Sequence, residues 1–478
     1  MPDRPNILFF LCDQLRAFEV GCYGGTHVRT PNMDRLAAEG TRFVHAVSNN
    51  PICTPARSIM LSGEYSRTCT GMLGNVHDNP PNPERVRLVD PTLPETLREA
   101  GYRTALVGKW HVDPQPRLVG FDRTVYPDFE HTYYGQRYWD ETGRSWTVDD
   151  FGPDYELATL EAFLDEPRDE PFFVFHNIGQ PHQPIGPGHM PERYTTMYDP
   201  ARVPLRPNVP DELDPDNARH WYNIYTSAAY FWRHVAGQAQ DPADLVDDAF
   251  SIRDLTALYC GATTLVDDYL GHVLKALEQR GLLENTILVF TSDHGDNLGS
   301  HGRFNKAALI EESIRIPLLV RDPRAPDGIA ADGGVASLVD VLPTLLDLAG
   351  VAAPDCVQGT SLAPVVRGEP GAVLPDAACI ETHGVVGIRT ATHLLGIGFD
   401  EASRTAADAP ALFYDLERDP FELANLAATD EEAGVRAALE ARLRAWDAGT
   451  PWLDAPPPSS IHDHLARSGW VDEKGDDA

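Results

Sequence analysis

Continuous apolar runs of strand length recur along this chain, and each is followed by polar residues. They occupy 6–12, 103–107, 171–178 and 286–291. A strand without polar alternation is typical of a parallel sheet whose two faces are both covered by helices. A segment of helical periodicity at 251–280 precedes the last of these runs. The pattern predicts an α/β fold with a large, mostly parallel central sheet flanked by helices.

A change of composition divides the predicted fold. The segment 368–376, GEPGAVLPD, has the glycines and prolines that are typical of a boundary. We therefore expect a large α/β domain over 1–375 and a smaller C-terminal α+β subdomain over 376–449. Residues 450–478 contain three consecutive prolines and are expected to form an extended tail, for which oligomer contacts are one hypothesis.

Two stretches have no clear periodicity. Residues 121–154 are rich in Tyr, Trp and Asp, and we expect an irregular segment over the mouth of a site. A local core or an oligomer contact is the alternative for most of its aromatic residues, and a cage for a quaternary ammonium group, built from 133–146, is a further hypothesis. We assign no element to 186–250.

The segment 50–63, NPICTPARSIMLSG, places Cys53, Pro55 and Arg57 in the pattern CxPxR. Pro55 suits the first turn of a helix, because its missing N–H would have no partner there. Cys53 is therefore expected just before a helix N-terminus, where backbone N–H groups and the helix dipole favour an anion and an activated nucleophile. Arg57 can bind two oxygens of a tetrahedral oxyanion. The motif alone also fits a buried structural cysteine beside a surface arginine.

Polar pairs follow the first and the last of the apolar runs. Asp13 and Gln14 follow the first run, and Asp293 and His294 follow the last. Ligands in open α/β sheets bind outside the carboxyl ends of the strands. The four side chains are therefore expected to form the two halves of a metal site. For Asp13 alone, a role as the cap of the next segment is an equal alternative.

Further polar candidates lie after the remaining strands and in the loops. Lys109 and His111, in the sequence GKWH, point the same way in an extended segment and suit an oxyanion pocket, unless Lys109 lies on the surface. His182 is held in an extended loop by flanking prolines and is a candidate general acid. Asn75 can reach into the site from its loop, and Lys306 lies a short loop after the Asp-His pair.

Composition limits the partners and the compartment. The formal net charge of −33 argues against nucleic acid and against an acidic membrane surface, so an anion site must be a local positive pocket. The seven cysteines are scattered without CxxC spacing, which indicates neither a zinc ribbon nor a disulfide framework. The apolar run at the N-terminus is too short for a signal peptide, and no segment has transmembrane length. The sequence therefore predicts a cytoplasmic protein.

Taken together, the motifs resemble those of the sulfatases, a family of the alkaline phosphatase superfamily. They are the first strand with Asp13, the CxPxR helix, GKWH, PHxP, SDHGD, Lys306 and the hairpin at 412–421, all in the order of the family. The resemblance implies an alkaline phosphatase-like fold in which 1–375 is the catalytic domain. The Asp-Gln pair with SDHGD is similar to a cytosolic bacterial subgroup of arylsulfatases, choline sulfatases and phosphonate monoester hydrolases.

The resemblance implies that a formylglycine-generating enzyme oxidises Cys53 to formylglycine (3-oxoalanine), whose hydrated geminal diol is the nucleophile. A divalent metal held by Asp13, Gln14, Asp293 and His294, with residue 53 as a further ligand, would lower the pKa of one diol hydroxyl.

The remaining roles are also implied by the resemblance. Arg57, Lys109 and Lys306 would hold the sulfate oxygens, with Asn75 as a further substrate contact. His182, with Lys306, would protonate the leaving alcohol. His111 would take the proton of the second hydroxyl, so that sulfate is expelled and the aldehyde is restored.

Three positions depart from the family pattern. Ala56 stands where serine is frequent, Gln14 where many members have a second Asp, and His294 where many have Asn. The three residues of CxPxR are intact, so we still expect the modification. The family implies Ca²⁺, and we predict Ca²⁺, with Mn²⁺ or another divalent metal as the alternative because imidazole suits transition metals better.

Three functions follow in order. The leading prediction is hydrolysis of a small organic sulfate ester to an alcohol and sulfate. The alternative is hydrolysis of phosphonate monoesters or phosphodiesters by the same residues, because a phosphoryl group has a similar tetrahedral shape. The third is a non-catalytic anion-binding relative in which Cys53 stays a thiol, although such a protein has no need for both His111 and His182.

Overall fold

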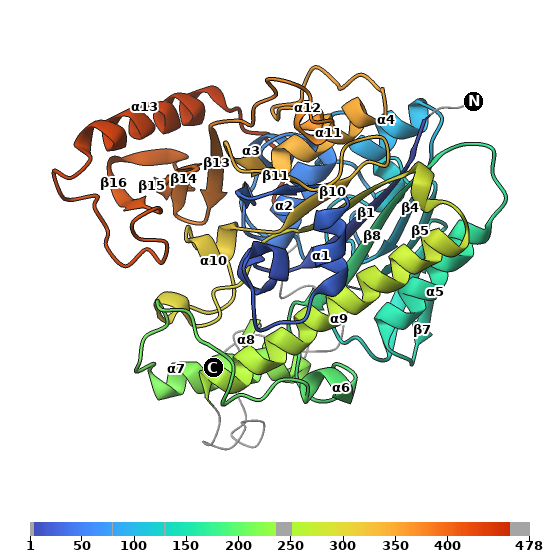
Figure 1. The fold of residues 1–478 in the computed structure, drawn as a ribbon, viewed down its shortest axis with the longest axis horizontal. Helices are drawn as coiled ribbons and strands as arrows, with labels where there is room; N and C mark the ends of the chain where they lie inside the picture. The colour runs from blue at the N-terminus through green and yellow to red at the C-terminus, as the bar shows by residue number, and fades with distance from the viewer. Residues whose placement is uncertain (1–3, 79, 129–130, 236–250, 459–478) are drawn as a thin grey trace.

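The computed structural model describes residues 4–78, 80–128, 131–235 and 251–458. A ten-stranded sheet with the order β11-β2-β10-β9-β1-β8-β4-β5-β6-β7 runs through its larger part (Figure 1). In that order the strands are Ile329–Ala331, Thr41–Phe43, Leu318–Arg321, Thr286–Ser292, Asn6–Asp13, Phe172–Pro181, Arg103–Gly108, Arg123–Pro127, Gln136–Asp140 and Ser145–Val148.

The five strands in the middle of the sheet, β9, β1, β8, β4 and β5, are parallel to one another. Antiparallel pairing is confined to β10, β6 and β7 and their neighbours. Every residue of β1 is buried, with Leu8 opposite Val174 of β8 and Phe10 opposite Phe290 of β9. The predicted α/β fold with a large central sheet is confirmed, and the continuous apolar runs are its buried strands.

Helices cover both faces of the sheet, and the side chains of β1 alternate between two cores. Phe9 and Leu11 pack in one core with α2, α4 and α11, whereas Leu8 and Phe10 pack in the other with α1, α5 and α9. Figure 1 shows these two groups of helices on opposite sides of the sheet. The helices are α1 (Pro31–Ala38), α2 (Cys53–Ser62), α4 (Leu93–Glu99), α5 (Gly152–Asp165), α9 (Ile252–Gln279) and α11 (Val341–Leu348).

The expectation about the segment 121–154 is wrong. The segment 121–154 is not irregular, because it forms β5, β6 and β7 at one edge of the sheet and begins α5. Its Tyr and Trp residues favour strands, and the strands are too short to give a visible period. A short strand β3 (Ala46–Val47) follows β2 along the chain and pairs with β12 (Ala336–Ser337) in a separate sheet.

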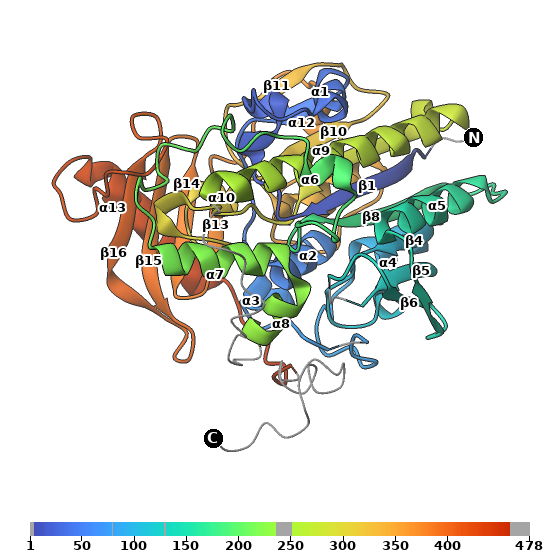
Figure 2. The ribbon, with the colours of Figure 1, turned by 90° about the horizontal axis from the view of Figure 1, so that it is seen from below.

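A second, antiparallel sheet follows near the C-terminus, with α13 across it (Figures 1 and 2). It consists of β13 (Ala377–Thr382), β14 (Val385–Thr390), β15 (His393–Asp400) and β16 (Thr405–Asp415), and α13 spans Ala433–Gly449. This is the predicted smaller α+β part. The boundaries at 375 and 449 stay a prediction.

The remaining α-helices of the described residues are α3 (Ser66–Cys69), α6 (Glu192–Thr195), α7 (Pro215–Thr226), α8 (Ala228–Val235), α10 (Glu311–Ile314) and α12 (Ala363–Val366). Three of them fall in 186–250, to which no element had been assigned, and residues 236–250 of that stretch lie outside the described residues. Among all helices of the described ranges, none combines the length and the apolar character that a membrane span requires.

Arg67 of α3 joins the C-terminal sheet to the main body. Its buried guanidinium forms ion pairs with Glu381 of β13 and Asp447 of α13. The Cζ atom of the same guanidinium lies 4.6 Å from the ring centre of Trp446 and 4.8 Å from that of Trp452. Trp452 lies in the predicted tail, so the described part of the tail, 450–458, is held against the protein at this point; residues 459–478 lie outside the described residues.

Replacing Arg67 with Met is expected to destabilise the protein by about 3–5 kcal/mol, because Glu381 is fully buried and would lose its cation. Thermal and urea unfolding measure the change. Arg67→Lys, which keeps the charge but not the planar fork, should lie between Arg67→Met and the unmodified protein. An unchanged unfolding midpoint in Arg67→Met would contradict this account of the junction.

Candidate active site

Most of the predicted site residues lie at one edge of the central sheet. Asp13 is the last residue of β1, Asp293 and His294 follow β9, Lys109 follows β4, and His182 follows β8. Because these strands are neighbours and parallel, their carboxyl ends meet at that edge. The structure thus brings together residues that are up to 281 positions apart, as Asp13 and His294 are, in the sequence.

Cys53 stands at the centre of this group, and it is the first residue of α2 and not the residue before it. Its side chain is fully buried. The Sγ atom lies 2.9 Å from Lys306 Nζ, 3.4 Å from His294 Nε2, 3.7 Å from Asp13 Oδ1 and 3.9 Å from Lys109 Nζ. Burial raises the pKa of the Cys53 thiol. The positive charges of Lys109 and Lys306 lower the pKa by more than burial raises it, so that it falls to about 6. The position therefore favours an anion.

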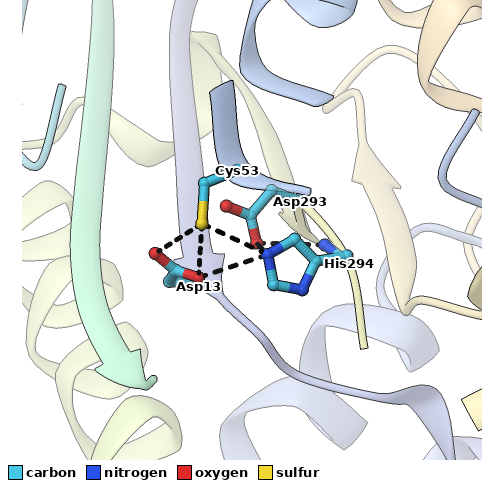
Figure 3. A group of neighbouring side chains, drawn as sticks. All are labelled: Asp13, Cys53, Asp293 and His294. Carbon is cyan, nitrogen blue, oxygen red and sulfur yellow. Dashed lines mark hydrogen bonds and ion pairs between the residues drawn. The ribbon is translucent and has the colours of Figure 1, made fainter. Parts of the chain in front are cut away.

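Four side chains point toward one another in the arrangement of a metal site: Asp13, Cys53, Asp293 and His294 (Figure 3). One ligand atom from each lies within 4.8 Å of all the others. His294 Nδ1 lies 2.9 Å from the carbonyl of Gly295, to which it donates its hydrogen, so the lone pair of Nε2 faces the group. Burial and the neighbouring Asp13 carboxylate raise the pKa of Asp293, although Arg57 pairs with both carboxylates.

Gln14 lies beside these ligands with its amide orientation fixed. Its Nε2 donates to Gln183 Oε1 at 2.9 Å and to Asp296 Oδ2 at 2.6 Å, which uses both amide hydrogens. Asp296 is itself held by the hydroxyl of Tyr225 at 2.7 Å. Gln14 Oε1 is buried and has no hydrogen-bond partner among the described residues. A buried amide oxygen that accepts no hydrogen bond is suited to bind a cation as an oxygen ligand.

The three basic side chains differ in their surroundings. Lys109 forms an ion pair with Asp13, and Lys306 bonds to the Cys53 sulfur. Arg57 is fully buried and donates from Nε to Asp293 Oδ2 at 3.0 Å and from Nη1 to the Lys109 carbonyl at 3.1 Å. In this structure Arg57 therefore positions a carboxylate of the candidate metal site and the Lys109 backbone.

A cavity of about 210 Å³ opens in front of Cys53. The side chains that line it are Cys53, Asn75, His77, His111, His131, His182, Gln183, Trp221, Ile224, Phe231, Trp232, Asn305 and Lys306. The expected Asn75, His111, His182 and Lys306 are among them. The aromatic cage from 133–146 is not, because the aromatic residues on this cavity come from α7 and α8.

The sequence analysis missed four polar residues that line the cavity, namely His77, His131, Gln183 and Asn305, and His131 has the closest contacts with the predicted site residues. Its ring stacks on that of His182 with centroids 4.1 Å apart, and its Nε2 lies 3.5 Å from Lys109 Nζ. It stands in a segment without a motif, so no signal in the sequence pointed to it. His182 Nδ1 lies 2.6 Å from the Gln183 carbonyl, which makes Nδ1 the donor and leaves Nε2 for the cavity.

Comparison with protein families matches this chain twice. The family model described as Sulfatase covers residues 5–351, and the model described as N-sulphoglucosamine sulphohydrolase, C-terminal, covers residues 299–448. The first match spans more than two thirds of the chain. It includes all of the candidate site residues named above.

Individual relatives agree with the family match. The Ulvan-active sulfatase of Formosa agariphila is 30% identical over 92% of this chain and 81% of its own length. The N-acetylglucosamine-6-O-sulfatase of Bacteroides thetaiotaomicron is 29% identical over 77% of this chain and 71% of its own length. A solved structure of a protein in complex with its substrate D-glucosamine-2-N,6-O-disulfate is 27% identical, with a TM-score of 0.74 over 93% of this chain and 98% of its own. The chain belongs to the sulfatase family, whose enzymes are sulfuric ester hydrolases.

Proposed function

We propose that this protein hydrolyses a small organic sulfate ester to an alcohol and sulfate, with formylglycine made from Cys53 as the nucleophile. The observation that carries the proposal is the position of the Cys53 sulfur, which lies within 4 Å of Lys306, His294, Asp13 and Lys109. The sulfur stands in for the hydrated aldehyde of the modified residue. A buried cysteine with a purely structural role is not expected to be surrounded by two lysines and a set of metal ligands.

A divalent metal fits the residues around Cys53. Asp13, Asp293, His294 and the partnerless oxygen of Gln14 would hold it, and residue 53 would complete the set. When bound, such a metal lowers the pKa of a hydroxyl group beside it and so supplies a nucleophile at neutral pH. We propose Ca²⁺ as this ion on the basis of the three oxygen ligands, and the imidazole makes Mn²⁺ the alternative that metal analysis would identify.

Basic side chains are proposed to hold the sulfate group. Lys109 and Lys306 both lie within 4 Å of the Cys53 sulfur and would offset the charge that builds on the sulfate oxygens. Arg57 would contribute its positive charge while it orients Asp293. Asn75, which accepts a hydrogen bond from the Thr54 N–H at 3.0 Å, lies on the cavity and is proposed as a further substrate contact.

The two histidines named from the sequence are proposed to move protons. One hydroxyl of the diol attacks sulfur, the bond between sulfur and the ester oxygen breaks, and His182 Nε2, assisted by Lys306, protonates the leaving alcohol. His111 then takes the proton of the second hydroxyl. The sulfate is expelled with the electron pair of its bond to residue 53, and the aldehyde returns.

Mass spectrometry of the peptide that spans Cys53 tests the proposal, on protein produced in a host with a formylglycine-generating enzyme. We expect a mass deficit for conversion of the thiol to the aldehyde, together with release of sulfate from a small sulfate ester. An unmodified thiol, in a host that converts a control sulfatase, would overturn the mechanism.

Hydrolysis of phosphonate monoesters is the second candidate, because the same anion pocket accepts a tetrahedral phosphoryl group. Comparing kcat/KM for one leaving group carried as sulfate and as phosphonate separates the two. We expect the sulfate to be preferred, and a preference for the phosphonate would replace the first candidate by the second.

Asp296 is expected to support the proposed metal site through Gln14. Asp296→Ala removes the acceptor that orients the Gln14 amide, so the affinity for the metal should fall by about 10–100-fold. Competition with a chelating dye measures it. Asp340→Ala is the matched control, because Asp340 is also buried but bonds to Ser337 and Thr360. Equal metal affinities in the two variants would contradict a role for Asp296.

A further inference from the structure

A second group of side chains has the arrangement of a metal site and shares no residue with the group at Cys53. It consists of His301, Glu312 and Glu422, and one ligand atom from each lies within 4.8 Å of the others. His301 follows β9, Glu312 lies in α10 and Glu422 follows β16. Figure 1 shows α10 beside the C-terminal sheet. The group therefore lies where the main body meets that sheet.

Both glutamates of this group keep one oxygen without a hydrogen-bond partner. Glu312 and Glu422 are 0% and 3% exposed. Glu312 Oε1 accepts from Arg206 and from Asn208, whereas its Oε2 has no partner among the described residues. Glu422 Oε2 accepts from the backbone N–H of Glu311 at 2.9 Å, and its Oε1 likewise has none. Buried carboxylate oxygens in this state need a cation or a proton.

Asn208 adds a third buried oxygen to the group. Its Nδ2 donates to Glu312 Oε1 at 2.8 Å and to the Phe421 carbonyl at 3.2 Å, which uses both amide hydrogens. The lone pair of His301 Nε2, 3.2 Å from the same nitrogen, is thereby left for another ligand. Asn208 Oδ1 is buried and has no partner in the described part of the chain. A proton on Glu422 joins two of the three oxygens at most, whereas a divalent cation can bind all three.

The group at Cys53 provides a comparison within the same structure. It contains two carboxylates, Asp13 and Asp293, the imidazole of His294, and the amide oxygen of Gln14, which is buried and has no partner among the described residues. The second group has the same kinds of donor: two carboxylates, one imidazole and one amide oxygen. Oxygen donors with imidazole suit a divalent metal in either place.

The basic side chains nearby pair with other carboxylates. Arginines form ion pairs with Glu311 and with Glu312, but within the described ranges none pairs with Glu422. Burial and the neighbouring charges of Glu311 and Glu312 raise the pKa of Glu422. A buried carboxylate in such a place keeps its charge only beside a cation.

We propose that His301, Glu312, Glu422 and the amide oxygen of Asn208 bind a second divalent cation, separate from the one proposed at Cys53. The ion fastens the C-terminal sheet, through Glu422, to α10 and to the loop of His301. Ile314 of α10 already packs in one core with Ile380 of β13, so the ion lies beside an existing contact between the two parts. The proposal does not depend on the proposed function.

Titration of the full chain with Mn²⁺, after removal of bound metal by a chelator, tests the proposal. The electron paramagnetic resonance signal of free Mn²⁺ gives the amount bound. We expect about two ions per chain in the unmodified protein. In Glu422→Gln and in His301→Ala the affinity for one of the two ions should fall by at least about 10-fold. The change between variants decides, so the result does not depend on the ion at Cys53.

Glu156→Gln is the matched control. Glu156 is also buried and has an oxygen without a partner among the described residues, but it belongs to none of their candidate metal groups. Its binding curve should equal that of the unmodified protein. His301 is half-buried, so His301→Ala decides if Glu422→Gln does not fold. An unchanged curve in His301→Ala would overturn the proposal and leave a proton on Glu422 as the occupant. A loss in Glu156→Gln as large as that in the two variants would also overturn it.

Discussion

Replacement of Cys53 by serine is expected to give an enzyme that reacts once and then stops. The serine hydroxyl occupies the place of the sulfur among Lys306, Lys109 and the candidate metal ligands, so it can still attack the sulfate ester. The resulting serine sulfate has no second hydroxyl from which His111 can take a proton. The steady-state rate should therefore fall by at least about 10⁴-fold.

Intact mass spectrometry after incubation with substrate measures the trapped product. Cys53→Ser should gain the mass of one SO₃ group per chain, whereas Cys53→Ala should lose the activity without gaining mass. Cys260→Ser is the matched control, because Cys260 is also fully buried but lies in α9. Turnover by Cys53→Ser at the rate of the unmodified sequence would show that a single hydroxyl suffices and would remove the need for formylglycine.

The arrangement of the site could be predicted because the fold makes it a consequence of strand order. Asp13, Lys109, His182 and Asp293 each come within four residues of the end of an apolar run. In a parallel sheet all such positions fall on one edge, so the sequence pattern alone implied that these side chains lie close together. Their roles in binding and catalysis remain predictions.

The strand pattern does not predict the aromatic residues that line the cavity, which come from α7 and α8. The start of α7 has a recognisable cap, since the Asp214 side chain accepts from the backbone N–H groups of Asp216 and Asn217. A cap shows where a helix begins but not where the helix packs. The position of Phe231 beside His182 depends on tertiary contacts, and the same holds for His131, which no motif accompanies.

The hydrogen-bond partners of Arg57 could also be identified only from the structure. Its place in CxPxR indicated an oxyanion contact, yet its guanidinium donates to Asp293 and to the Lys109 carbonyl. Buried arginine is stable only with acceptors for its hydrogens, and in this site two of the acceptors are carboxylates of the candidate metal site, Asp293 at 3.0 Å and Asp13 at 3.4 Å. Arg57 thus links the anion pocket to the metal site, and a change in one should affect the other.

Replacement of Asp293 by asparagine is accordingly expected to weaken both metal binding and catalysis. Asp293 Oδ2 accepts from Arg57, and Oδ1 accepts from the backbone N–H of Gln14 at 3.0 Å. Asparagine removes one negative charge from the metal site and the nearer of the two carboxylate partners of Arg57. The metal affinity should fall by about 10–100-fold, and kcat/KM by about 10³-fold. Metal analysis after dialysis and steady-state kinetics measure the two effects.

Titration with added metal separates the two causes. If weak binding alone limits Asp293→Asn, saturating metal should restore kcat, whereas loss of the Arg57 orientation should persist at any metal concentration. We expect only partial recovery, because both contacts are broken. Asp267→Asn is the control, since Asp267 is a fully buried carboxylate that bonds to Asn32 and Met33 at the start of α1. Its metal content and rate should stay unchanged, and retention of tight metal binding by Asp293→Asn would refute the proposed ligand set.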